Sequence, residues 1–290
     1  MVNKSSIDTS ENVAWDSVIT PQNNLFSLNL KEVFRFRDLM FMFVKRDVVT
    51  QYKQTILGPI WLVLQPLLTT LMFSVVFGGI ANISTDGTPK MLFYLASIPM
   101  WNYFSETLTT TSKTFTENAS IFGKVYFPRL VLPLSKLFSG IIKFFIQFGL
   151  FLVVWVYNVY TGEVHPNSYM LFAPLVLIVL ATMSLGFGIL ITSLTTKYRD
   201  LTFLIGFGVQ LLMYATPVIL PLSIIKSPTK LFWMRLNPLT SLFELFKHGF
   251  LGKGEVSWMW LLYSVTFSLV VLIAGVVVFN RVEKKFIDTV

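Results

Sequence analysis

Apolar and polar positions separate into long blocks along this chain instead of alternating residue by residue. With a window of about nineteen residues, six apolar segments are long enough to form helices that cross a bilayer. They lie near residues 58–81, 91–112, 134–158, 171–194, 201–220 and 258–280. Helices satisfy their backbone polar groups internally, as lipid requires. The pattern therefore predicts an all-α membrane protein with six transmembrane helices.

The first apolar segment begins abruptly. The basic, polar stretch that starts at Arg46 ends at Gly58-Pro59, and no charged residue follows until Asp86. Proline lacks an N–H and has a preset φ, so Pro59 suits the first turn of a new helix. Pro66 is predicted to kink this helix within its first two turns.

Residues 30–48 are too charged to span a membrane. Their charged side chains, which include Arg35, Lys45 and Arg46, lie largely on one helical face, and apolar side chains lie on the other. This pattern predicts an amphipathic helix in the membrane interface. The alternative is a soluble amphipathic helix that packs on a partner.

Residues 221–257 contain two apolar pieces, 230–236 and 240–251, each too short to cross a hydrocarbon core of about 30 Å. Asn237-Pro238 separates them. We predict two short re-entrant or interfacial helices that gate one mouth of the bundle. The candidate gate residues are Pro221, Trp233, Pro238, Phe243 and Phe246. The segment also carries five basic residues whose contacts the sequence leaves open: Lys226, Lys230, Arg235, Lys247 and Lys253.

Lysine and arginine are concentrated at alternate junctions. The opposite short loops, 82–90 and 161–170, contain only Lys90 between them. The positive-inside rule therefore predicts that both termini are cytoplasmic.

Composition agrees with a membrane protein. Apolar residues form 54% of the chain and charged residues 13%, with a net charge of +8 and no cysteine. Basic residues beside apolar spans favour anionic lipid headgroups over nucleic acid as partners. We predict one domain over residues 28–290. Residues 1–27 are predicted to be a disordered cytoplasmic tail without the pattern of a signal peptide.

The sequence contains no pattern typical of an enzyme or a metal site. His165 and His248 lie in separate loops without partners at metal-ligand spacing. A phosphate-binding loop of the form G-x-x-x-x-G-K-[ST] is also lacking, so this chain has no ATPase motif and no predicted cofactor. Transport work would need energy from a partner or a gradient.

Two charged residues fall inside predicted spans. Glu106 in the second span and Lys143 in the third have depths that agree within roughly 3 Å at 1.5 Å per residue. Pairing would relieve much of the cost of burying either charge. The open alternative is that Lys143 snorkels to the headgroups while Glu106 faces a watery cavity.

A polar stripe runs along the third span. Lys136, Gly140, Lys143 and Gln147 follow helical spacing, which predicts a face turned to protein or water.

Aromatic residues are dense, and most are expected to face lipid. A minority are candidates for lining a conduit, because flat apolar rings with polar rims suit sugars. These candidates are Trp61, Phe73, Phe77, Tyr94, Trp101, Tyr103, Phe104, Phe207 and Tyr214.

The cytoplasmic loop 117–130 mixes aromatic and basic residues, which favours a docking surface. An interfacial anchor of Phe and Lys is the alternative. The candidate contact residues of the docking surface are Glu117, Ile121, Phe122, Lys124, Tyr126, Phe127 and Arg129.

Five phrases in order resemble the membrane subunit of type-2 ABC exporters of bacterial polysaccharides, the permeases for O-antigen, capsule and teichoic acid. They are KRDVVTQYKQTILGPIWLVLQP at 45–66, IFGKVYFPRLVLP at 121–133, KYRDL at 197–201, TPVILP at 216–221 and NPLTSLFELFKHGFLG at 237–252. The resemblance covers residues 28–290. It implies a multi-pass protein of the bacterial inner membrane, present as a homodimer bound to two copies of a separate ATPase, which holds ATP and Mg.

The resemblance further implies a coupling helix within 117–130 beside the interfacial helix, and short gating helices within 221–251 at the periplasmic mouth. The cargo would be a polyprenyl-diphosphate-linked glycan. Basic residues would meet its diphosphate or acidic groups of the ATPase: Arg46, Lys53, Lys124, Arg129 and Arg199.

Two other functions stay open. A drug or lipid exporter permease belongs to the same class. A membrane-embedded glycosyl- or acyltransferase would need convergent acids or histidines, for which Asp86, Glu163 and His165 are the candidates.

Overall fold

A computed structural model describes residues 30–53, 55–122, 126–195 and 200–287. Every regular element within these ranges is helical, as the apolar block pattern predicts. The predicted tail 1–27 and the side chains of Phe122, Lys124 and Arg199 lie outside the described part.

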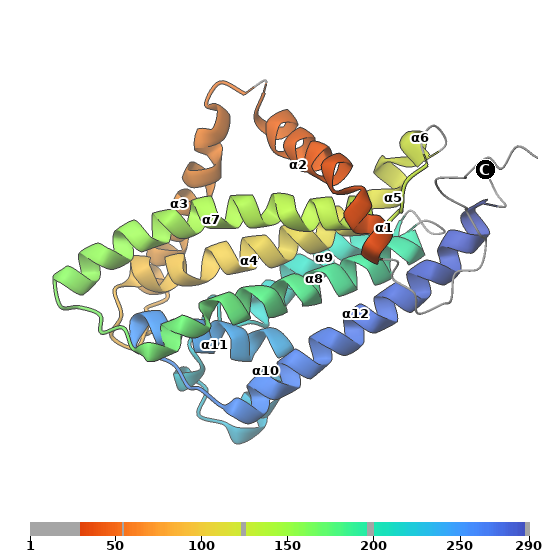
Figure 1. Cartoon of the computed structure of the whole chain (residues 1–290). Helices are drawn as coiled ribbons and strands as arrows, with labels where there is room; N and C mark the ends of the chain where they lie inside the picture. The colour runs from red at the N-terminus through yellow and green to blue at the C-terminus, as the bar shows by residue number, and fades with distance from the viewer. Residues whose placement is uncertain (1–29, 54, 123–125, 196–199, 288–290) are drawn as a thin grey trace, which may run out of the picture.

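The segment predicted to form an interfacial helix is helical and consists of two pieces. Helix α1 spans Leu30–Arg35 and α2 spans Arg37–Tyr52, so the helical segment extends beyond the expected residue 48. Helix α2 packs along α7. Figure 1 shows α2 and α3 meeting at a corner that stands away from the other helices.

The first apolar segment folds as a 3-10 turn, Gly58–Ile60, followed by α3, Trp61–Phe73, and a π-helical segment, Ser74–Ile80. Pro59 lies in the first turn, which confirms the predicted start. Pro66 lies inside α3, and its carbonyl accepts a hydrogen bond from Thr70 Oγ1 at 2.7 Å.

Helix α4, Lys90–Ser112, occupies the centre of the bundle. It packs against α3, α7, α8, α9 and α11. Its many Ser and Thr side chains return hydrogen bonds to their own backbone, for example Thr110 Oγ1 to the Glu106 carbonyl at 2.7 Å. These bonds satisfy part of the polar groups of α4. The buried hydroxyls of Tyr94, Tyr103, Thr107 and Thr111 have no hydrogen-bond partner among the described residues.

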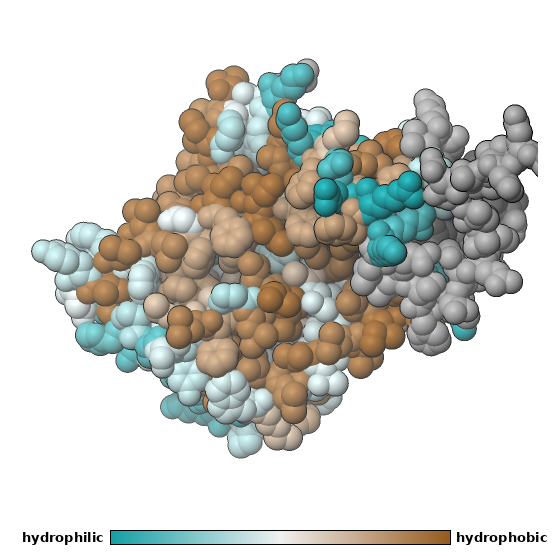
Figure 2. Space-filling view, viewed as in Figure 1, coloured by the Kyte–Doolittle hydropathy of each residue, from teal (hydrophilic) through white to brown (hydrophobic). Residues whose placement is uncertain are grey.

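Three more long helices complete the bundle: two pack on α4, and the third packs on α8. They are α7, Val131–Tyr160; α8, Ala173–Thr195, which follows a 3-10 turn at Ser168–Phe172; and α12, Trp258–Ile287. Within the described ranges, four segments are long and apolar enough to cross a membrane: Gly58–Ile80, Val131–Tyr160, Ser168–Thr195 and Trp258–Arg281. The chain is therefore an α-helical, multi-pass membrane protein, and Figure 2 shows the broad apolar surface that this requires.

The fifth predicted span has a wrong C-terminal boundary. Helix α9 covers Leu201–Tyr214 instead of continuing to residue 220. Pro217 disfavours helical backbone at Thr216, and the chain continues as turns through buried Val218 and Ile219. At 1.5 Å per residue α9 is about 21 Å long, shorter than a hydrocarbon core.

The two short helices predicted between spans five and six are present. A 3-10 turn, Leu222–Ile224, precedes α10, Pro228–Leu236, and α11 spans Pro238–Leu251. Asn237 separates them, and its side chain accepts a hydrogen bond from Leu239 N at 3.1 Å as an N-cap. Helix α11 is buried against α4, α8 and α12, whereas α10 has no buried residue.

Helices α5, Thr114–Glu117, and α6, Ala119–Phe122, follow α4 directly. They lie near α1 at one end of the bundle, whereas α10 and α11 lie toward the other (Figure 1). The predicted docking loop and the predicted gate are therefore at opposite ends.

Candidate transport cleft

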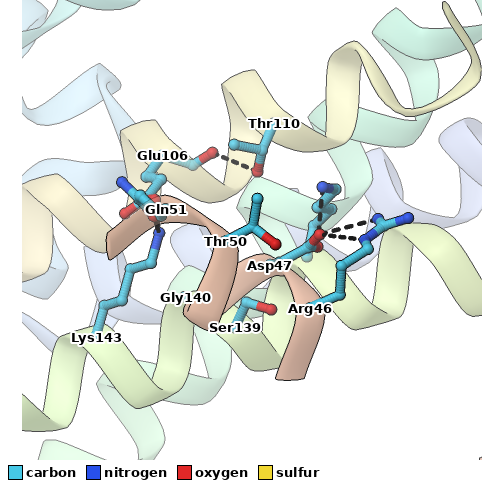
Figure 3. A pocket seen from close by; sticks show the side chains of 10 residues that line it. Arg46, Asp47, Thr50, Gln51, Glu106, Thr110, Ser139, Gly140 and Lys143 are labelled. Carbon is cyan, nitrogen blue, oxygen red and sulfur yellow. Dashed lines mark hydrogen bonds and ion pairs between the residues drawn. The ribbon is translucent and has the colours of Figure 1, made fainter. Parts of the chain in front are cut away.

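A polar cleft lies among α2, α3, α4, α7 and α9. It has two adjoining sections that share Gln51, Glu106 and Lys143. We call the first the charged section, with a volume of about 340 Å³, and the second the amide section, with about 410 Å³. The charged section is lined by Arg46, Asp47, Thr50, Gln51, Glu106, Thr110, Lys136, Ser139, Gly140 and Lys143 (Figure 3).

One face of α7 forms a wall of both sections. Lys136 and Gly140 line the charged section, Gln147 lines the amide section, and Lys143 lies between them. The polar stripe of the third predicted span therefore faces the cleft, which explains why these residues recur at helical spacing.

The structure brings Glu106 and Lys143 together as an ion pair, and Lys143 Nζ also donates to Gln51 Oε1. The Lys143 side chain is only 9% exposed, whereas that of Glu106 is 31% exposed. A snorkelling lysine would be far more exposed, so pairing is the alternative that this geometry favours. The contact joins α2, α4 and α7.

A second ionic cluster fastens α2 to α7. Lys136 Nζ lies 2.9 Å from Asp47 Oδ2, and Arg46 donates to Asp47 Oδ1 at 2.9 and 3.0 Å. Arg46 also reaches Asn118 Oδ1 at 3.4 Å and lies 4.9 Å from the centre of the Phe43 ring. Arg46 therefore connects the cleft to the segment between α5 and α6.

Side-chain amides dominate the amide section, where Asn102 Nδ2 donates to Gln147 Oε1 at 3.0 Å. At its rim, burial and the negative charge of Glu106 raise the pKa of Tyr52 to about 12. The lining residues are Gln51, Tyr52, Leu62, Gln65, Trp101, Asn102, Ser105, Glu106, Thr109, Lys143, Gln147, Gly206, Val209 and Gln210.

The nine aromatic conduit candidates do not share one surface. Four from α4 are buried: Tyr94, Trp101, Tyr103 and Phe104. Phe73 and Phe77 pack edge to face at 5.2 Å between ring centres. Trp61, Phe207 and Tyr214 are exposed. Trp101 is the one conduit candidate among the described residues that line the cleft. The other buried candidates pack between helices, where burial of ring area is favourable.

The docking-loop candidates divide between surface and core. Glu117 and Tyr126 are exposed, and Ile121 and Arg129 are half-buried. Phe127 is buried, with its ring centre 5.8 Å from that of Phe43 in α2. Helix α2 therefore lies beside this loop.

Most gate candidates lie in the core. Phe243 and Phe246 of α11 and Pro221 are buried, and Pro238 is half-buried as the first residue of α11. Trp233 of α10 is exposed.

Glu244 and Lys247 are two buried charged residues of α11 that the sequence analysis did not identify as a site. Lys247 Nζ donates to the Pro217 carbonyl and lies 3.8 Å from the centre of the Phe93 ring. Glu244 Oε2 accepts from Glu255 N at 3.1 Å. Burial raises the pKa of Glu244 and lowers that of Lys247 to about 8. Their i, i+3 spacing within a mainly apolar helix is the signal that could have identified them.

Comparison with known proteins identifies the family. The model of the family described as ABC-2 type transporter matches residues 38–251. Two curated relatives from Klebsiella pneumoniae, both named O-antigen export system permease protein RfbA, are 26% identical over 258 and 257 residues, with coverage of 87% of this chain and 94% of each relative. A protein of the same name from Myxococcus xanthus is 24% identical over 262 residues, with coverage of 90% of this chain and 98% of that protein.

The family match spans well over half of the chain and includes α2, the cleft-lining helices and α11. It agrees with the resemblance carried by the five sequence phrases. This chain therefore belongs to the ABC-2 type transporter family.

Proposed function

We propose that this chain is the permease half of an exporter that moves a polyprenyl-diphosphate-linked polysaccharide, such as O-antigen, outward across the bacterial inner membrane. Family membership makes the chain a transmembrane subunit whose ATPase is a separate partner. The observation that carries the cargo assignment is the match to three O-antigen export permeases over 87–90% of this chain.

The proposed assembly is a homodimer with two ATPase subunits that bind ATP and Mg. The exposed apolar side chains of α3 and α9, such as Met72, Phe203 and Phe207, support a surface that meets lipid or a second copy. Loop 117–130, with exposed Glu117 and Tyr126 beside α2, is the proposed ATPase-coupling surface.

The proposed topology has six spans and cytoplasmic termini. Helix α4 would be the second span, and α9 with the following turns would be the fifth. Polar side chains in the cleft support a hydrophilic cargo over the small hydrophobe of a drug or lipid exporter, whose path would be apolar. Glycan would enter from the cytoplasmic leaflet, and α10 and α11 would gate the periplasmic mouth.

Deletion of the gene for this chain tests the function in the cell. We expect surface glycan to disappear and lipid-linked glycan to accumulate inside, with both restored by the wild-type chain on a plasmid. Unchanged surface glycan in the deletion strain would rule out the proposed cargo.

A further inference from the structure

The amide section gathers carboxamide side chains from five different helices. Each helix supplies one: Gln51 from α2, Gln65 from α3, Asn102 from α4, Gln147 from α7 and Gln210 from α9. A carboxamide both donates and accepts hydrogen bonds and carries no net charge. Their convergence therefore builds a neutral, hydrogen-bonding lining.

Much of this hydrogen-bonding capacity is unused within the described chain. The side-chain amides of Gln65 and Gln210 have no hydrogen-bond partner among the described residues. In contrast, the hydroxyls of Thr69 and Thr70 donate to backbone carbonyls of α3 at 2.9 and 2.7 Å. The Asn102–Gln147 bond uses one amide donor and one amide acceptor. Gln65 and Gln210 are exposed residues that line the section, so their amides are open to water or to a ligand.

The charge of the section points to a neutral ligand. Its one described lysine, Lys143, is neutralised by its one described acid, Glu106. The adjoining charged section holds three basic and two acidic side chains and is better suited to an anion.

Aromatic groups complete the lining. Trp101 and Tyr52 border the amides, and an aromatic ring next to hydrogen-bonding groups fits a molecule with both C–H faces and hydroxyls. The volume of about 410 Å³ falls within the roughly 300–1,000 Å³ of small-molecule sites. It suits a short saccharide segment.

We propose that the amide section is a saccharide-binding site, in which Gln65, Gln210 and the Asn102–Gln147 pair hydrogen-bond the hydroxyls of neutral sugar units. The assignment rests on the proposed glycan cargo and adds the place in the chain where that cargo is held.

Binding measurements on the full-length chain in nanodiscs test the site. The probe is a neutral oligosaccharide released by mild acid from the surface glycan of the cell that carries this chain, titrated by calorimetry. Gln65→Leu with Gln210→Leu should weaken binding about tenfold, because two hydrogen-bonding groups are lost. The matched control is Thr69→Val, which removes a polar group from α3 outside the lining and should leave binding unchanged.

Inorganic pyrophosphate serves as the second probe. We expect it not to compete with the oligosaccharide. Competition by pyrophosphate, or equal oligosaccharide binding by the wild-type chain and the double variant, overturns the assignment. If the double variant fails to reach the membrane, Gln65→Ala and Gln210→Ala measured singly decide by the same criteria.

Complementation of the deletion strain separates this inference from the proposed function. If deletion abolishes surface glycan but the double variant binds and exports like wild type, the saccharide site is wrong and the exporter assignment stands. If deletion leaves surface glycan unchanged, the exporter assignment fails whatever the binding data give.

Discussion

At the scale of single residues, one lysine joins three helices. Lys143 contacts Glu106 of α4 and Gln51 of α2 from its position on α7. The Glu106–Lys143 pairing was foreseeable, because the constant helical rise places both at similar depth. The Asp47–Lys136 pair was not, since sequence spacing does not tell which side of the bundle an interfacial helix covers.

Charge reversal tests the pair. Glu106→Lys should reduce export about tenfold or more by placing two like charges together in a poorly solvated site. Lys143→Glu should do the same. The double reversal should recover most of the export, as measured by surface glycan at matched protein levels. A double variant no better than the singles would contradict a direct interaction.

Gly140 permits close packing of α7 on α4. A Cβ at this position would lie 2.7 Å from Thr107 Oγ1 and 3.2 Å from Tyr103 Cε2. Gly140→Ala should therefore lower the free energy of unfolding by about 1–3 kcal/mol through overpacking. Gly149→Ala, on the same helix with open space at its Cβ, is the control. Equal thermal unfolding of the two variants in detergent would refute the tight contact.

At the scale of elements, the sequence predicted which segments are helical more accurately than where each helix ends. Apolar run length identified α3, α7, α8 and α12, and Asn237-Pro238 correctly separated α10 from α11. The end of α9 was missed because residues 215–220 are apolar. Hydropathy does not register that Pro217 stops the helix and that the following turns are covered by protein.

Lys247 fastens α11 to the turns after α9. Its folded pKa of about 8 is below the ordinary 10.5, so from pH 8 to 10.5 the unfolded chain binds more protons than the folded one. The free energy of unfolding contributed by this group therefore rises with pH in that window. Glu244 and Asp86 are the acids that face it, and Lys253 borders the same small cavity.

We therefore expect the apparent melting temperature of wild type, relative to Lys247→Met, to increase between about pH 7.5 and 10. Lys230→Met removes an exposed lysine of α10 and should leave the pH dependence as in wild type. Parallel melting curves for wild type and Lys247→Met across this range would show that Lys247 does not titrate as described.

At the scale of the whole molecule, the tightly packed contact between α8 and α12 is separate from the polar cleft. A Cβ on Gly186 of α8 would lie 2.8 Å from Leu272 backbone, and one on Gly275 of α12 would lie 2.6 Å from the Gly186 carbonyl. Such close approach makes the α8–α12 pair a compact unit. The cleft lies among α2, α3, α4, α7 and α9, and none of its described lining residues belongs to α8 or α12.

The central claim is that this chain forms the path for a lipid-linked glycan. The most direct measurement reconstitutes the purified chain with its partner ATPase in proteoliposomes that contain radiolabelled lipid-linked glycan. The account predicts that ATP moves glycan to the leaflet opposite the ATPase, and that Gln65→Leu with Gln210→Leu slows this movement. Movement of glycan at the same rate without this chain, or none with ATP and both subunits present, would contradict it.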